Sequence, residues 1–482
     1  MTTVKRAAGG DPPPTSGAPG EVREGSYGAK VAAVEPGGAE FIPLEERHGR
    51  PLDLLWTWMS PNLEFATVYV GVISVLFFQQ TLWQATLGII VGTALGSLTQ
   101  GLLSIRGPRH GVPQMVLSRI GFGFRGNILP AGINAVVAGV GWFAVNSVSG
   151  ALALSTLLHL PKLLSLVIVV AAQVAIAFFG HNLVHVFERY AFPVLAVAFL
   201  LATVYSLARA NPGAATGGGG FGGFLVTVGA AFGYAAGWNP YAADYTRYLP
   251  PGSNPRAVAL WPALGVFVSC VVLEVAGAAS ATIAGGATDN PTAAFTGHLP
   301  ALVADLTLLA IAIGAVSANV LNIYSGAMSF LALGIRLPLA ARRAIVALAF
   351  GAIGFVLAWS GLHDVKEYEN FLLIISYWIG PWLGVYFMDW LLRRGRRVDG
   401  FLFDRRHNPW AGVVAMALSM AVSISLFSNQ DDYKAPVPKH FPAFGDITFE
   451  VGFVLAAASY AWLFWLQRDR RAEAMLIPAA GT

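Results

Sequence analysis

Two pairs of side chains with stacking or hydrogen-bonding chemistry lie at helical spacing inside long apolar runs. Trp142 and Asn146 are four residues apart in "GVGWFAVNSVSG", and Asn319 and Asn322 are three apart in "AVSANVLNIYSGAMS". Residues three or four apart share one face of a helix. An indole offers a flat stacking surface, and a carboxamide offers donors and an acceptor. These faces therefore suit a planar, uncharged, hydrogen-bonding ring such as a nucleobase.

Each pair also has a purely structural interpretation. Trp142 can pack against lipid or the protein core, and the two amides of Asn319 and Asn322 can join helices by hydrogen bonds. Ser317 and Tyr324 extend the amides into a polar strip. Polar side chains at such depth tend to face the interior of a helix bundle. For the amides, both interpretations therefore point to the interior of the protein.

A third polar feature interrupts the sixth apolar run. The segment "GYAAGWNPYAADYTRYLP" (residues 233–250) contains Asn239 and Pro240. Proline removes a backbone donor and clashes with the preceding turn, and lipid supplies no replacement partner. We expect a broken helix here, as at the substrate sites of secondary transporters; a proline kink relieved by neighbouring helices is the alternative. Gly71, in "ATVYVGVISVLF", predicts a weaker interruption of the first run.

The charged and titratable side chains in or near these runs suggest proton carriage, an ion pair or packing. Glu274 in "CVVLEVAGA" lies well inside an apolar run. An intramembrane carboxyl suggests proton carriage, and a hydrogen-bonded structural acid is the alternative. Asp244 and Arg247, one turn apart, are expected to form a local ion pair. His181 and His185 are four apart but lack a third ligand, so we expect no metal site.

The remaining motifs argue against an enzyme. "GFGFRG" matches G-x-G-x-x-G but follows no predicted strand, and no Walker motif is present. The single cysteine, Cys270, excludes an internal disulfide framework and a cysteine metal cluster. We expect no cofactor and find no catalytic groups gathered at one interface. A channel is disfavoured because the polar residues concentrate at mid-depth instead of forming a continuous lining.

Composition identifies the elements that must position these residues. The 482 residues are 55% hydrophobic and 12% charged, with a mean hydropathy of +0.61, whereas soluble domains carry about 25% charged residues. A membrane span needs about 20 mostly apolar residues. The predicted fold is all-α and integral to the membrane, with twelve spans at 62–83, 84–105, 128–155, 162–180, 188–208, 222–247, 257–284, 300–332, 343–361, 368–392, 410–428 and 447–466.

The ends of the chain differ from this core. Residues 1–52, rich in Gly, Pro and charge, are expected to form a disordered cytoplasmic tail. The transporter domain is expected over 53–467 and a second cytoplasmic tail over 468–482. Arg and Lys concentrate in the loops on the N-terminal side, which predicts that both termini are cytoplasmic. The basic residues thus indicate orientation in a multi-pass plasma-membrane protein, with lipid around it and no nucleic-acid partner.

Several segments together resemble one family. "GWNPYAADYTRYLP" resembles the W-x-P-Y-A-x-D-Y-x-R-Y-x-P signature of purine-cytosine permeases in the nucleobase:cation symporter-1 family. "GWFAVNSVSGA" is similar to the family's third-helix segment, and "SANVLNIYSGAMS" to its eighth-helix region. "GFRGNILPAGIN" is like the loop that precedes the third helix. These matches occur in order between about residues 54 and 466.

The resemblance implies a leucine-transporter-type fold: ten core helices in two inverted repeats of five, plus two peripheral helices. It implies that the base lies between aromatic residues of the third and sixth helices, with amides reading its edge. Trp142 is then the stacking residue and Asn146 the edge-reading amide. Trp238 is the second aromatic, or Tyr234 if the break shifts the register. From the eighth helix the resemblance implies Asn322, with Asn319 next.

The coupling ion is less constrained. In sodium-driven relatives, the resemblance implies a site of backbone carbonyls from the first helix, here near Gly71, and two adjacent hydroxyls of the eighth. The matching pair is Ser317 and Ala318, so one hydroxyl is missing. This departure favours protons, with Glu274 as the carrier. Sodium stays open, because carbonyl oxygens alone can supply most of a coordination shell.

The sequence therefore predicts a secondary transporter that imports cytosine, a purine or a related heterocycle by cation symport with alternating access. A transporter of the same fold for another small solute, such as an allantoin or hydantoin, a vitamin or an amino acid, is the alternative. An amino acid would need a partner for its carboxylate or ammonium group, and the candidate residues carry no formal charge. No obligate protein partner is expected.

Overall fold

A computed structural model describes residues 30, 31, 33–214, 217–283, 290–335, 342–361, 367–430 and 432–467. Within these residues the elements are helices, apart from isolated bridge residues such as the pair Asn429 and Lys434. The C-terminal tail expected over 468–482 and the first part of the N-terminal tail lie outside the described residues.

One group of helices is built on α3 (Leu82–Ser104). It packs against α11 (Gly220–Ala236) and α13 (Pro255–Ala281), and α13 packs in turn against α1 (Asp53–Met59) and α2 (Phe65–Leu76). Small residues let these backbones approach closely. A Cβ added at Gly277 would lie 1.8 Å from the carbonyl oxygen of Val68, so the α2–α13 contact needs a glycine there.

A second group is built on α15 (Ala301–Leu331). This helix packs against α8 (Phe143–Leu158), α9 (Lys162–Phe179) and α16 (Arg342–Gly361). The long helix α10 (His181–Arg209) contacts α15 and α9 of this group and also α13 and α1 of the first. It therefore joins the two groups.

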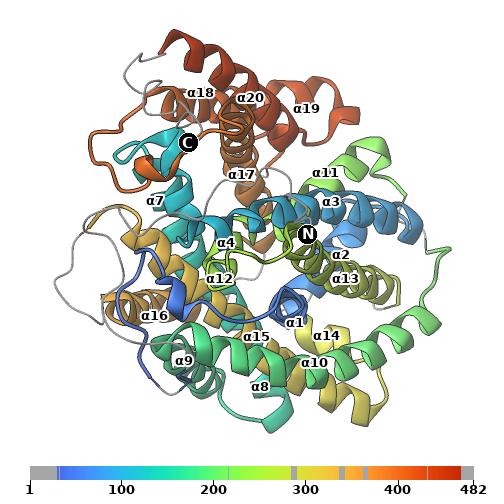
Figure 1. Cartoon of the computed structure of the whole chain (residues 1–482). Helices are drawn as coiled ribbons and strands as arrows, with labels where there is room; N and C mark the ends of the chain where they lie inside the picture. The colour runs from blue at the N-terminus through green and yellow to red at the C-terminus, as the bar shows by residue number, and fades with distance from the viewer. Residues whose placement is uncertain are drawn as a thin grey trace, which may run out of the picture.

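A third set of helices lies at one edge of the molecule. Helices α17 (Glu367–Leu392), α18 (Ala411–Phe427) and α20 (Thr448–Leu466) pack on one another, and α17 also contacts α11. Figure 1 shows the orange and red helices of this set opposite α8, α9 and α10. The connections and shorter pieces are η1 (Leu44–Glu46), η2 (Ser60–Asn62), α4 (Arg106–His110), α5 (Gln114–Leu117), α6 (Arg119–Phe122), α7 (Ile128–Val136), η3 (Val137–Trp142), η4 (Asn239–Tyr241), α12 (Ala242–Thr246), α14 (Pro291–Thr296), η5 (Asp399–Phe401), α19 (Pro436–His440) and η6 (Pro442–Phe444).

The described part of the chain contains ten helices long and apolar enough to cross a membrane. An eleventh span is a bent pair, Asp53–Asn62 and Phe65–Leu76, which meet at 57°. Helix α18 is apolar but has 17 residues. A multi-pass all-α fold is therefore confirmed, whereas the exact number of twelve spans stays a prediction.

The segment before α1 is packed against the helices, although the sequence predicts a disordered tail up to residue 52. Glu35 and Ile42 are 1% and 0% exposed. The backbone N–H of Ile42 donates to the carbonyl of Gly111, and that of Glu35 to the carbonyl of Phe179. Apolar and ion-pairing residues near the end of this segment therefore find partners that its composition alone does not indicate.

Candidate functional site

A small cavity lies where the third, sixth and eighth expected spans meet. Five of the six residues predicted for the substrate line it, and all are buried. The lining consists of Trp142, Asn146, Tyr234, Gly237, Trp238 and Asn322. The sixth predicted residue, Asn319, is not in the lining. The wall is therefore made of aromatic rings and amides without a formal charge.

The α-helix of the sixth span is interrupted beside the cavity, as predicted, although Gly220–Thr246 as a whole still crosses as one span. Helix α11 ends at Ala236, a 3₁₀ turn runs over Asn239–Tyr241, and α12 begins at Ala242. Pro240 has no N–H to donate to the carbonyl of Ala236, four residues earlier, so the α-helix cannot continue there. A Cβ at Gly237 would lie 3.5 Å from the Trp142 ring. The break thus brings the backbone close to the indole.

The Trp142 side chain is fixed by its neighbours. It is the last residue of the π-helical turn η3, a local deviation found frequently at functional sites. Its ring makes edge contacts with Tyr234 (5.5 Å between centroids) and Phe371 (5.2 Å). Both rings approach at steep angles, which holds the indole plane in one orientation.

Asn319 lies behind the cavity wall and orients the two amides that line it. Its Oδ1 accepts from Asn146 Nδ2 at 3.1 Å and from Asn322 Nδ2 at 3.2 Å. Its own Nδ2 donates to the Phe143 carbonyl and to Ser147 Oγ. In the described part of the chain Asn146 Oδ1 has no hydrogen-bond partner, so it is a buried acceptor available to a ligand.

The aromatic residues of the sixth span are tied to the bend of the first. Trp238 Nε1 donates to Asn62 Oδ1 at 2.8 Å, and Tyr234 Oη donates to Glu64 Oε1 at 2.8 Å. Glu64 also accepts from the Ala66 N–H and caps α2. Asn62 and Glu64 are not predicted as site residues from the sequence, because both fall at the predicted edge of a span, where polar residues are ordinarily solvated. The signal was "SPNLEF", a proline with two polar residues directly before an apolar run.

The interruption predicted at Gly71 is wrong. Helix α2 is continuous from Phe65 to Leu76, and the bend of the first span lies before it, at Leu63–Glu64. A Cβ at Gly71 would lie 1.6 Å from the carbonyl oxygen of Glu274. Gly71 therefore permits two helices to pack, and it does not break one.

The other two residues predicted for the coupling ion lie in different places. Glu274 is fully buried between α13 and α3, and its Oε2 accepts from Thr93 Oγ1 at 2.9 Å. Ser317 donates to Glu188 Oε2 at 2.5 Å and lies 3.2 Å from Ser60 Oγ. Neither Glu274 nor Ser317 lines the cavity.

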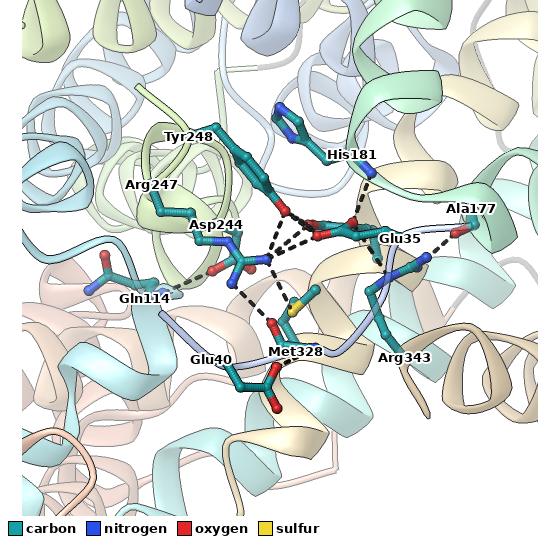
Figure 2. Close-up of polar contacts among 12 residues, drawn as sticks. Glu35, Glu40, Gln114, Ala177, His181, Asp244, Arg247, Tyr248, Met328 and Arg343 are labelled. Carbon is teal, nitrogen blue, oxygen red and sulfur yellow. Dashed lines mark hydrogen bonds and ion pairs between the residues drawn. The ribbon is translucent and has the colours of Figure 1, made fainter. Parts of the chain in front are cut away.

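The ion pair predicted between Asp244 and Arg247 is also wrong. Asp244 Oδ1 accepts from the Gln114 N–H at 2.9 Å, and Arg247 Nη2 lies 3.5 Å from Glu35 Oε1 (Figure 2). Arg343 Nε lies 3.6 Å from Glu35 Oε2 on the other side. The packed N-terminal segment supplies the acid that the sequence spacing assigned to Asp244.

No cluster of three or more metal-ligating side chains occurs among the described residues. His181 and His185 lie about one turn apart at the start of α10, with rings stacked 6.0 Å apart, and His181 also stacks on Tyr248 at 3.8 Å. These rings contribute to packing near the Glu35 carboxylate.

Residues 41–452 match a family described as "Permease for cytosine/purines, uracil, thiamine, allantoin". The chain belongs to the nucleobase-cation-symport-1 family. It is therefore a membrane transporter and not an enzyme. YxlA of Bacillus subtilis, named for the purine-cytosine permeases, is 29% identical over 456 residues, which cover 91% of this chain and 98% of the relative. The purine-cytosine permease fcyB of Emericella nidulans is 28% identical, covering 89% and 88%.

The fold of the symporter matches a solved structure of the same family. Mhp1, in a closed conformation with bromovinylhydantoin bound, has a TM-score of 0.72 at 20% identity and covers 92% of this chain and 98% of its own. The leucine-transporter-type fold expected from the sequence is thereby confirmed.

Proposed function

We propose that this symporter carries a small, neutral, planar heterocycle, cytosine or a related nucleobase, into the cell together with a proton. One observation carries the proposal: the cavity at the broken sixth span combines indole faces with primary amides and has no formal charge in its lining. An amino-acid carrier would need a partner for a carboxylate or ammonium group in this lining.

In this proposal the ring of the base lies against Trp142, with Trp238 or Tyr234 as the second aromatic wall. Stacking of a base on an aromatic side chain is worth about 1–3 kcal/mol. The edge of the base faces Asn146 and Asn322, since amides meet the donor–acceptor pattern of a base in two places. Asn319 acts through these amides and not by direct contact. Two ring contacts and several amide bonds suffice for micromolar binding, about −8 kcal/mol.

The residues that line the cavity are all buried. Release to either side then requires one helix group to move against the other, as in alternating access. We place the transporter in the plasma membrane with both termini in the cytoplasm.

The test is competition for uptake. Cells expressing the full chain are given labelled cytosine with an excess of one unlabelled compound: adenine, uracil, allantoin, a hydantoin, thiamine, cytidine or a neutral amino acid. We expect flat bases to compete and cytidine and the amino acid not to compete. Saturable uptake that only a hydantoin, allantoin or thiamine suppresses would replace the nucleobase with that class. Absence of saturable cytosine uptake, together with no competition by any base, would contradict the proposal.

A further inference from the structure

A buried carboxyl outside the cavity lining lies on α10. Glu188 is 0% exposed, and its Oε2 accepts from Ser317 Oγ at 2.5 Å. Ser317 Oγ is in turn 3.2 Å from Ser60 Oγ. In the described residues Glu188 Oε1 has no hydrogen-bond partner. The carboxyl is therefore enclosed, with one oxygen bonded and the other unsatisfied.

Glu188 is not neutralised by a cation among the described residues. Its own helix presents His185, one turn earlier, which is hydrogen-bonded to Thr57 Oγ1 at 3.1 Å, and the neighbouring Arg189 is exposed. From α12, Tyr245 is the nearby titratable group. The charged groups of the other helices packed against α10 lie elsewhere. Lys162 of α9 and Asp305 of α15 are exposed, and Asp53 of α1 lies beside His185. Helix α13 carries Arg256 at its start and Glu274, which is bonded to Thr93.

Such a carboxyl is stable in the closed protein when it is protonated. An ionised carboxylate without a cation is strongly disfavoured in a buried site, and here one oxygen also lacks a donor. When this region opens to water the charged form becomes accessible. The enclosure of Glu188 is thus linked to proton binding.

The position of Glu188 also connects the two helix groups. Its partner Ser317 is on α15, and Ser60 is in η2, at the bend of the first span. Two residues beyond Ser317 is Asn319, which orients the cavity amides, and two beyond Ser60 is Asn62, which holds the Trp238 indole. Movement that separates these three elements would expose the carboxyl and change both cavity walls together.

We propose that Glu188, with Ser317 and Ser60, binds the coupling proton of this symporter. The inference rests on the proposed function, because it assigns a residue to the proton of that transport cycle. The proton enters when the site faces outside, neutralises the carboxyl so that the groups can close, and leaves when the site opens inside. Glu274 is disfavoured for this role because its bond to Thr93 joins α13 and α3 within one group.

The experiment uses the full chain in proteoliposomes and separates exchange from coupled transport. Labelled cytosine exchange against internal cytosine measures binding and alternating access without net proton movement. Accumulation driven by an imposed pH gradient measures coupling. We expect Glu188→Gln to retain exchange and to lose at least tenfold of the gradient-driven accumulation, with Glu274→Gln retaining both. A wild-type protein without cytosine exchange would contradict the proposed function and not the proton site.

A substrate-free measurement tests the site even in that case. The wild-type melting temperature in detergent should fall with rising pH more steeply than that of Glu188→Gln, because the unfolded chain releases this proton more readily than the folded one. Glu188→Asp is the second variant, for use if the amide misfolds, and should shift the pH profile of accumulation. Equal accumulation by wild type and Glu188→Gln, accumulation that requires sodium at constant pH, or loss of coupling in Glu274→Gln alone would each overturn the inference. A pH profile of Glu188→Asp identical to that of the wild type would do the same.

Discussion

Glu35 Oε1 lies 3.5 Å from Arg247 Nη2, although 212 residues separate the two in the sequence. The same carboxylate faces Arg343 and accepts from the His181 N–H, and hydroxyls of Tyr248 and Tyr324 point to it. One acid of the N-terminal segment thus joins residues that follow the sixth span to α10, α15 and α16 (Figure 2).

Glu35→Gln should destabilise the protein. Both arginines are buried, and removal of one partner from a buried ion pair costs about 3–5 kcal/mol because it leaves an uncompensated charge. The measurement is the melting temperature of the purified protein in detergent. Glu45→Gln is the matched control, since Glu45 is exposed in the same segment, and should leave the temperature unchanged. Equal temperatures for the two variants would show that the contact contributes nothing to stability.

Trp142→Ala and Asn322→Ala should each abolish saturable uptake while the protein remains in the membrane. Loss of a stacking face alone removes about 1–3 kcal/mol, or up to about a hundredfold in affinity. Uptake is followed at several cytosine concentrations, with membrane abundance measured on the same cells. Trp462→Ala is the control, because this tryptophan is 65% exposed on α20. Normal transport in both site variants would refute the assignment of the cavity.

Trp238 and Asn62 should be energetically coupled. Trp238→Phe removes the indole donor and Asn62→Ala removes its acceptor at 2.8 Å. A hydrogen bond of this type contributes about 1 kcal/mol, so each variant should raise the cytosine concentration for half-maximal uptake about fivefold. The double variant should be little worse than either single one. Strictly multiplicative effects would mean that the bond does not position the indole.

Gly71→Ala should prevent correct packing of α2 on α13. The added Cβ would meet the Glu274 carbonyl oxygen at 1.6 Å, and a backbone atom cannot move aside as a side chain can. Gly132→Ala is the control, since its Cβ would meet Leu333 at an ordinary 3.8 Å. Membrane abundance and melting temperature should fall for the first and stay normal for the second. If Gly71→Ala is stable and loses only ion coupling, the role first expected for Gly71 holds instead.

The sequence predicts the parts of this protein that depend on local chemistry. Proline at 240 dictates the end of α11 whatever surrounds it, and amides on one helical face lie near each other once the helices pack. The position of the first bend does not follow from local sequence in this way. Gly71 permits close packing of α2 against the backbone of α13 and does not mark the bend. Partner choice is likewise tertiary: Arg247 has Asp244 one turn away, yet it pairs with Glu35 from the segment before α1.

Acids at span edges are the second kind of residue that sequence reasoning does not resolve. Glu64 and Glu188 each fall where a predicted span begins, and a carboxylate there is ordinarily hydrated. Tyr234 reaches Glu64, and Ser317 reaches Glu188, only after folding, so the burial of these acids follows from packing and not from the apolar pattern. Asn319 illustrates the converse, since its type suggests contact with cargo while its neighbours place it behind the wall.

The side-chain oxygen of Asn319 accepts hydrogen bonds from both Asn146 and Asn322, which come from different helices. One oxygen atom therefore orients both amides that line the cavity proposed to bind the substrate. Adaptation to a new solute cannot move either amide independently, because a shift of one changes the Asn319 acceptor that it shares with the other. A change of substrate would thus require paired substitutions, one on α8 and one on α15.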